Sequence, residues 1–126
     1  MDITLWIIAS VLALAFLAAG AMKLVQPKEK LAASGMGWTD DFSLRAIKLI
    51  AGLEILAAVG LILPAALGIA PILAPLAALG LVLIMAGAIV THARRKESQM
   101  VIVNLVLLVL AAAVAWGRLG PYAFAA

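Results

Sequence analysis

Four long apolar runs limit the fold of this chain more than any other feature of its sequence. Within 126 residues they occupy positions 3–25, 44–63, 67–90 and 100–119, with short connections between them. Each run is long enough to cross a hydrocarbon layer about 30 Å thick as a helix that rises about 1.5 Å per residue. We therefore expect an all-α fold, an integral membrane four-helix bundle with short loops, in a single domain over residues 1–126.

The composition excludes several classes of function. Hydrophobic residues make up 67% of the chain and charged residues 12%, too few charges for a separate soluble catalytic domain. The chain has no cysteine and one histidine, which excludes disulfides, thiol redox chemistry, a zinc site and paired axial histidines for haem. The GxxxxGK(S/T), GxGxxG and GxSxG patterns do not occur. We expect no metal site, no catalytic residue and no catalytic activity of this chain alone.

Three prolines mark the expected ends of the middle runs. Pro64 closes the second run, and Pro71 and Pro75 lie in the first turns of the third, where a missing backbone N–H costs least. The longest connection lies between the first two runs. We expect it to form a short interfacial helix from Pro27 to Ala33, with Trp38 as an interfacial anchor.

Glycines inside the apolar runs are expected to mark close helix crossings. Without a Cβ, a glycine lets the backbone of a neighbouring helix approach closely. The glycines in question are Gly20, Gly52, Gly60, Gly80 and Gly87.

The basic residues predict how the chain is oriented in the membrane. Eight of the nine Lys and Arg residues lie at or near the first and third connections: Lys23, Lys28, Lys30, Arg45, Lys48, Arg94, Arg95 and Lys96. By the positive-inside rule, loops 26–43 and 91–99 are expected to be cytoplasmic and both termini outside. This asymmetry accounts for the net charge of +3, so no nucleic acid partner is expected.

Glu54 is the polar residue that a membrane span should most strongly exclude. It lies nine residues after Arg45 and nine before Leu63, close to the expected midplane. An ionisable group there costs on the order of 3 kcal/mol. Ala51 and Ala58 flank it on the same helix face and allow another helix to approach. Glu54 therefore needs a partner from another helix, or a proton.

Three polar residues in other runs are candidate partners, and together with Glu54 they form our candidate site. Lys23 lies near the inner end of the first run, His92 at the inner end of the third, and Asn104 one turn into the fourth. A cluster of these four residues could bind a quinone headgroup or a lipid by hydrogen bonds, or relay protons.

Each of the four residues also has a simpler structural interpretation. Glu54 could be a structural polar link, and Lys23 could extend to the inner headgroups. His92 could be an ordinary interfacial histidine, and Asn104 could form a hydrogen bond between helices. The sequence leaves these interpretations open beside the binding hypothesis.

Two short motifs resemble the DoxX-like family of small membrane proteins. Residues 16–24, FLAAGAMKL, are similar to the first-helix motif of that family, in which a Gly precedes an apolar pair, Lys and Leu. Residues 45–63, RAIKLIAGLEILAAVGLIL, are similar to its second-helix motif with Gly-x-Glu. His92 at the end of the third run matches less specifically.

The resemblance implies a compact four-helix membrane fold, in a bacterial inner membrane, with Lys23 and Glu54 as the paired polar positions. Some DoxX relatives are subunits of thiosulfate:quinone oxidoreductases, and a vertebrate DoxX-like member is an assembly chaperone for nicotinic acetylcholine receptors. Because this chain has no cysteine, a thiol-dependent role does not carry over.

Three functions follow as hypotheses. The first is a non-enzymatic subunit, assembly factor or lipid- or quinone-binding module that uses Lys23 and Glu54, with membrane lipids, another membrane protein or a second copy of the chain as partners. The second is a small proton-coupled transporter, although such transporters carry their acid in the first helix, and residues 3–25 contain none. The third is the membrane subunit of a quinone-linked redox complex, with quinone as the candidate cofactor.

Overall fold

The computed structural model describes residues 2–33 and 36–124, and these residues form helices and turns without any strand. The four long helices are α1 (Asp2–Val25), α3 (Leu44–Leu67), α4 (Leu73–Arg94) and α5 (Ser98–Leu119). Each is long and apolar enough to cross a membrane. The all-α, four-helix membrane fold predicted from the sequence is confirmed.

The outer surface of the bundle is apolar, as expected for helices that face lipid. Large hydrophobic side chains such as Ile3, Leu14 and Leu83 are about three-quarters exposed, at 75%, 72% and 74%. A surface of this kind is stable in hydrocarbon and would be costly in water. The chain is therefore an integral membrane protein.

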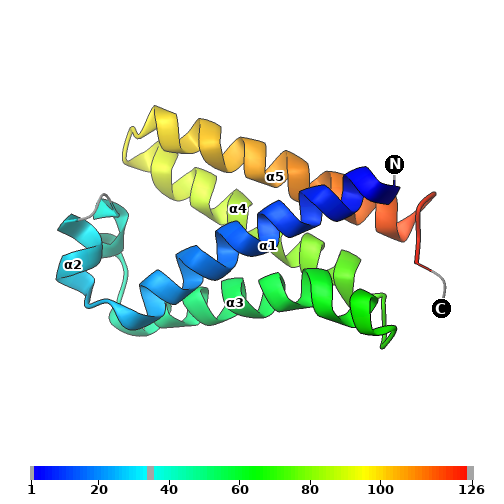
Figure 1. Ribbon diagram of the computed structural model, residues 1–126. Coiled ribbons are helices and arrows are strands. Elements are labelled where there is room, and N and C mark those ends of the chain that lie inside the picture. The colour runs from blue at the N-terminus through cyan, green and yellow to red at the C-terminus, as the bar shows by residue number, and fades with distance from the viewer. Residues whose placement is uncertain (1, 34–35, 125–126) are drawn as a thin grey trace.

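The bundle consists of two helix pairs that diverge along its length. α1 packs along α3, α4 packs along α5, and α3 joins the two pairs by packing on α4. Figure 1 shows α1 close to α5 at the end that holds both chain termini, which we call the terminal end. At the opposite end, which we call the α2 end, α1 and α3 lie apart from α4 and α5. The short helix α2 (Lys28–Ala33) occupies this end.

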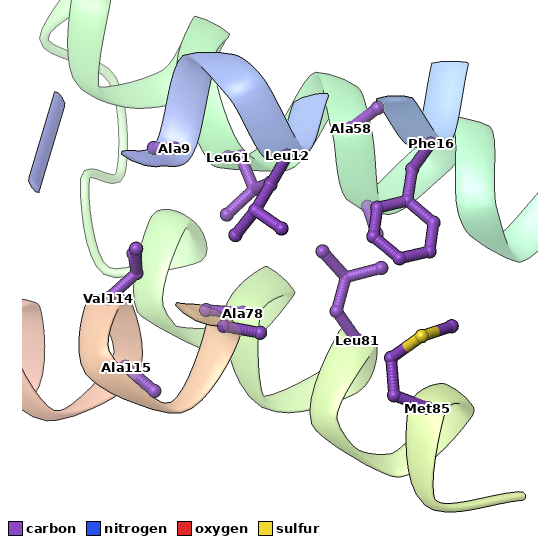
Figure 2. Packing of buried hydrophobic residues seen from close by; sticks show 12 residues of the cluster. Ala9, Leu12, Phe16, Ala58, Leu61, Ala78, Leu81, Met85, Val114 and Ala115 are labelled. Atoms are coloured by element: carbon purple, nitrogen blue, oxygen red, sulfur yellow. The ribbon is translucent and has the colours of Figure 1, made fainter. Parts of the chain in front are cut away.

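The core is built from leucines surrounded by small residues. Leu12 of α1, Leu61 of α3 and Leu81 of α4 are fully buried, and Figure 2 shows them pointing into the same interior. Around them lie Ala9, Ala58, Ala78, Ala111 and Ala115. Small side chains allow close helix packing, which is the main stabilising interaction between helices in lipid.

Only some of the glycines lie at close helix crossings. A Cβ at Gly20 of α1 would lie 2.9 Å from the Ala51 carbonyl oxygen of α3, and one at Gly60 would lie 3.1 Å from Ala77 Cβ. For three others a Cβ would meet nothing within 4 Å, namely Gly52, Gly80 and Gly87. The expectation of close crossings is therefore wrong at these three positions, because glycine is also frequent elsewhere in membrane helices.

Several helix boundaries differ from those predicted: α4 ends at Arg94 rather than 90, α5 begins at Ser98 rather than 100, and the turn between α3 and α4 lies later in the chain than expected. α3 continues past Pro64 to Leu67, because a proline in the last turn removes only one backbone bond and the Ile69 N–H still donates to the Pro64 carbonyl at 2.8 Å. Gly68 then ends the helix with a left-handed φ of 68°. α4 begins at Leu73 rather than 67, so Pro71 precedes the helix. Because the residues between α3 and α4 are also apolar, the hydropathy pattern does not indicate where this turn lies.

The connection between α1 and α3 folds over the α2 end. The predicted short helix is present as α2, beginning at Lys28 rather than Pro27, and the 3-10 helix η1 (Gly37–Asp41) follows it. Thr39 of η1 is fully buried, and its hydroxyl donates to the Met36 carbonyl at 2.7 Å. The Trp38 ring packs against Phe42 and His92, at centroid distances of 5.6 and 6.3 Å. Trp38 therefore packs inward on the bundle.

Candidate ligand-binding cavity

An ion pair between α1 and α3 is the centre of the site. Lys23 Nζ donates to Glu54 Oε1 at 2.5 Å, and the two side chains are 9% and 2% exposed. The close approach of the helices at Gly20 brings the last turn of α1 beside the middle of α3. Of the three candidate partners of Glu54, Lys23 is therefore the one that contacts it.

A second lysine holds the end of α1 in place. Lys48 Nζ of α3 donates to the Lys23 carbonyl at 3.0 Å and also to the Leu24 carbonyl. The last carbonyls of a helix have no partner within the helix, and a cation there is favourable. Lys48 thus positions the backbone of the residue that pairs with Glu54, a role that sequence reasoning missed.

His92 is paired with a residue other than Glu54. Its Nδ1 lies 2.8 Å from Glu97 Oε1, in the turn between α4 and α5. Glu97 also lies 3.4 Å from Arg95 Nε. Lys96 takes a φ of 60° in this turn, which bends the chain so that Glu97 returns toward the end of α4. Sequence reasoning missed Glu97, although a carboxylate five residues after a lone histidine was a usable signal.

Asn104 is buried on α5 with part of its amide unpaired. The residue is 6% exposed, and its Nδ2 has no hydrogen-bond partner among the described residues. Leaving a buried polar group unsatisfied costs about 1–3 kcal/mol. The hydrogen bond between helices that was one interpretation of Asn104 is not formed by this nitrogen.

A cavity of about 450 Å³ lies between the two helix pairs, and all four predicted site residues line it. This volume is within the range of about 300–1,000 Å³ typical of small-molecule sites. Most of its wall is apolar, with contributions from Phe16, Ile84, Met85 and Leu107. Met36, Trp38 and Phe42 line it at the α2 end, and the Trp38 ring centroid lies 5.3 Å from Lys23 Nζ. The structure thus combines an apolar chamber with a small number of polar groups.

The terminal end has its own buried cation, Arg118. Arg118 of α5 donates to Asp2 Oδ1 at 2.5 Å and to the Tyr122 carbonyl at 3.0 Å. Its guanidinium carbon lies 3.9 Å from the Phe124 ring centroid and 5.7 Å from that of Trp6. The contacts with Asp2 and Trp6 link the two ends of the chain, and those with Tyr122 and Phe124 hold the residues that follow α5, so Arg118 closes the bundle at the terminal end.

The donor set of the cavity fits hydrogen bonding rather than metal chemistry. In the described part of the chain, no group of three or more His, Cys, Asp or Glu residues could hold a metal ion. Lys23 and Asn104 offer N–H donors, and Glu54 offers carboxylate oxygens. The cavity can therefore orient a polar headgroup while its apolar wall holds a hydrophobic body.

These features define a small four-helix integral membrane protein with a polar site inside the bundle. A sequence model described as the DoxX-like family matches residues 7–114, and the chain belongs to this family. The match extends from α1 into α5 and includes all four site residues. No curated protein and no solved structure matched the chain.

Proposed function

We propose that this protein is a non-enzymatic membrane subunit or assembly factor that binds a lipid or a quinone in the cavity beside Lys23 and Glu54. The observation that carries the proposal is the cavity itself, whose wall is apolar except where these two residues and their polar neighbours meet it. An amphiphile has the matching distribution, with a hydrophobic body and a polar head.

The ion pair alone would fit a purely structural role, so the space beside it matters. Membrane helices can use a buried Lys–Glu pair simply to associate, and such a pair needs no adjacent cavity. Here the pair is direct at 2.5 Å and still lies at the wall of about 450 Å³ of space. A structural ion pair alone does not account for this space, whose size and mostly apolar wall are typical of a small-molecule site.

The basic residues support an orientation for this site. Both loops that carry them lie at the α2 end, and the termini lie at the other. By the positive-inside rule we place the α2 end in the cytoplasm, in a bacterial inner membrane. The cavity then lies in the cytoplasmic half of the bilayer.

The test is to identify what the purified protein carries. Protein purified in detergent would be extracted with organic solvent, and the extract analysed by mass spectrometry for lipids and quinones. Ala19→Phe would fill the cavity, which Ala19 lines, while Ala18→Phe would add the same group on the exposed face of α1.

We expect one lipid or quinone species to be enriched with wild type and Ala18→Phe and depleted at least about fivefold with Ala19→Phe. Equal recovery from the two variants would overturn the proposal. Enrichment of a quinone would favour a membrane subunit of a quinone-linked redox complex, whose redox group would lie on a partner protein. That partner would be another membrane protein, because this chain has no cysteine and only one histidine.

Proton-coupled transport is the alternative function, and one observation favours it. Glu54 is a carboxylate inside the membrane that lines a cavity. Substrate-driven proton flux in liposomes that disappears in Glu54→Gln would support transport, and absence of flux in the wild type would exclude it. The direct pairing with Lys23 leaves the carboxylate occupied, so we place binding first.

A further inference from the structure

We infer that the ligand of this cavity is an uncharged amphiphile with an acceptor oxygen in its head, and that Asn104 is the residue that selects it. This ligand class rests on the proposed function, since it defines which of the lipids and quinones the cavity takes. Three independent features of the cavity lead to it: its charge balance, the unpaired amide of Asn104, and the position of its opening.

The cation and the carboxylate at the cavity wall are already matched. Lys23 is paired with Glu54 at 2.5 Å, and His92 Nδ1 is occupied by Glu97 at 2.8 Å. A negatively charged headgroup would therefore meet a cation whose charge is already balanced, together with the carboxylate of Glu54. Bringing a net charge into such a buried site costs several kcal/mol unless an unpaired counter-charge receives it. An uncharged head avoids this cost.

Asn104 supplies what an uncharged head would need. Among the described side chains that line the cavity, its Nδ2 is a buried donor without a partner. A ligand oxygen that accepts from this N–H group would satisfy it, and a ligand without an acceptor would leave the donor unpaired. Sites built around such a donor discriminate strongly against analogues that lack the matching group.

The cavity borders the lipid-facing surface of the bundle. Two of its lining residues, Leu83 of α4 and Val103 of α5, are 74% and 43% exposed on helices that face lipid. At the α2 end, Trp38 and Phe42 lie at the wall of the cavity. A ligand that reaches the site from the hydrocarbon layer must itself be lipophilic, which a small water-soluble solute is not.

The experiment compares two probes that differ in head charge and otherwise by a single methyl group. The probes, both used at mildly alkaline pH, are dibromostearic acid, which is then an anion, and its methyl ester, which is uncharged and keeps an acceptor oxygen. Bromine quenches tryptophan fluorescence at short range, and Trp38 lines the cavity. A Trp6→Phe and Trp116→Phe background leaves Trp38 as the reporter, because the chain has three tryptophans. A Trp6→Phe and Trp38→Phe protein, with the exposed Trp116, measures partition into the detergent micelle.

We expect saturable quenching of Trp38 by the ester at concentrations at least about tenfold lower than by the acid, after correction with the Trp116 protein. Asn104→Leu should weaken ester binding about fivefold to tenfold, which corresponds to one neutral hydrogen bond. Its melting temperature should be unchanged or higher, since leucine replaces an unsatisfied amide. A structural role of Asn104 would instead lower the melting temperature.

Two results would overturn the inference while leaving lipid binding intact. Acid binding as tight as ester binding would contradict the uncharged ligand class. Full ester affinity in Asn104→Leu would contradict the role of Asn104. Failure of the proposed function gives a different result, namely no saturable quenching of Trp38 by either probe and equal lipid recovery from Ala19→Phe and Ala18→Phe.

Discussion

The two ends of the bundle each contain a buried cation paired with a carboxylate at 2.5 Å, yet their surroundings differ. At the terminal end, Arg118 also bonds a backbone carbonyl and stacks on the Phe124 ring. At the α2 end, Lys23 and Glu54 face a cavity that an unpaired amide also lines. An ion pair of the same length thus closes the bundle at the terminal end and forms part of a candidate binding site at the α2 end. The burial of the carboxylate, which is 63% exposed in Asp2 and 2% in Glu54, and the cavity beside Lys23 separate the two roles.

The largest effect is expected from removing the charge of Glu54. Glu54→Gln would leave Lys23 buried without a counter-charge, which costs about 3–5 kcal/mol in buried pairs. The melting temperature in detergent should fall strongly. A Lys23→Met and Glu54→Leu double variant should recover most of the loss, because apolar residues of similar volume replace buried pairs well. Melting of Glu54→Gln at the wild-type temperature would contradict the buried pair.

At the terminal end, Arg118→Leu should cost stability and leave ligand recovery unchanged. The variant loses charge-assisted bonds to Asp2 and Tyr122, with an expected loss of about 2–3 kcal/mol. Melting temperature and lipid content would be measured on the same preparation. If the folded fraction were equal and the bound lipid were depleted, this result would contradict the claim that Arg118 stabilises the bundle without contributing to ligand binding.

The helix crossing that brings Lys23 to Glu54 can be tested at Gly20. Gly20→Ala would place a Cβ 2.9 Å from the backbone oxygen of Ala51, so α1 and α3 must separate, at a cost of about 1–3 kcal/mol. Gly52→Ala is the matched control, because its Cβ would meet nothing within 4 Å. Equal melting temperatures for the two variants would show that the crossing does not limit stability.

The smallest effect is expected at Lys48. Lys48→Met removes the bonds to the carbonyls of Lys23 and Leu24 and should cost about 1 kcal/mol, the typical net value of a hydrogen bond. Arg45→Met, an exposed basic residue one turn earlier, should cost less. A larger loss with Arg45→Met than with Lys48→Met would contradict the proposed positioning of α1.

Much of the fold could be predicted because hydropathy reports membrane spans directly. Four apolar runs become four helices, and Glu54 is conspicuous because an acid within a span is costly. The end of α3 and the start of α4 could not be predicted, because the turn between these helices is apolar and Pro64 is tolerated in the last turn of α3. Hydropathy measures burial in lipid and carries little information about where a helix stops.

The parts of the site that could not be predicted depend on the conformation of turns and on how side chains pack in three dimensions. Lys23 was a candidate partner of Glu54 because its extended side chain could bridge the gap between the inner end of the first run and the level of Glu54. The pairing of His92 with Glu97 depends on the conformation of a turn, and the position of Trp38 depends on how η1 folds. That Asn104 Nδ2 lacks a hydrogen-bond partner among the described residues can be recognised only from the positions of the side chains around it.

The most direct test of the central claim is an experimental density map of the wild-type protein in lipid at high resolution. We predict elongated density in the cavity, with its polar end within hydrogen-bond distance of Asn104 and its body against the apolar wall near Phe16. A cavity closed by its own side chains, with the Lys23–Glu54 pair intact and no density beside it, would contradict ligand binding and leave the pair a purely structural role.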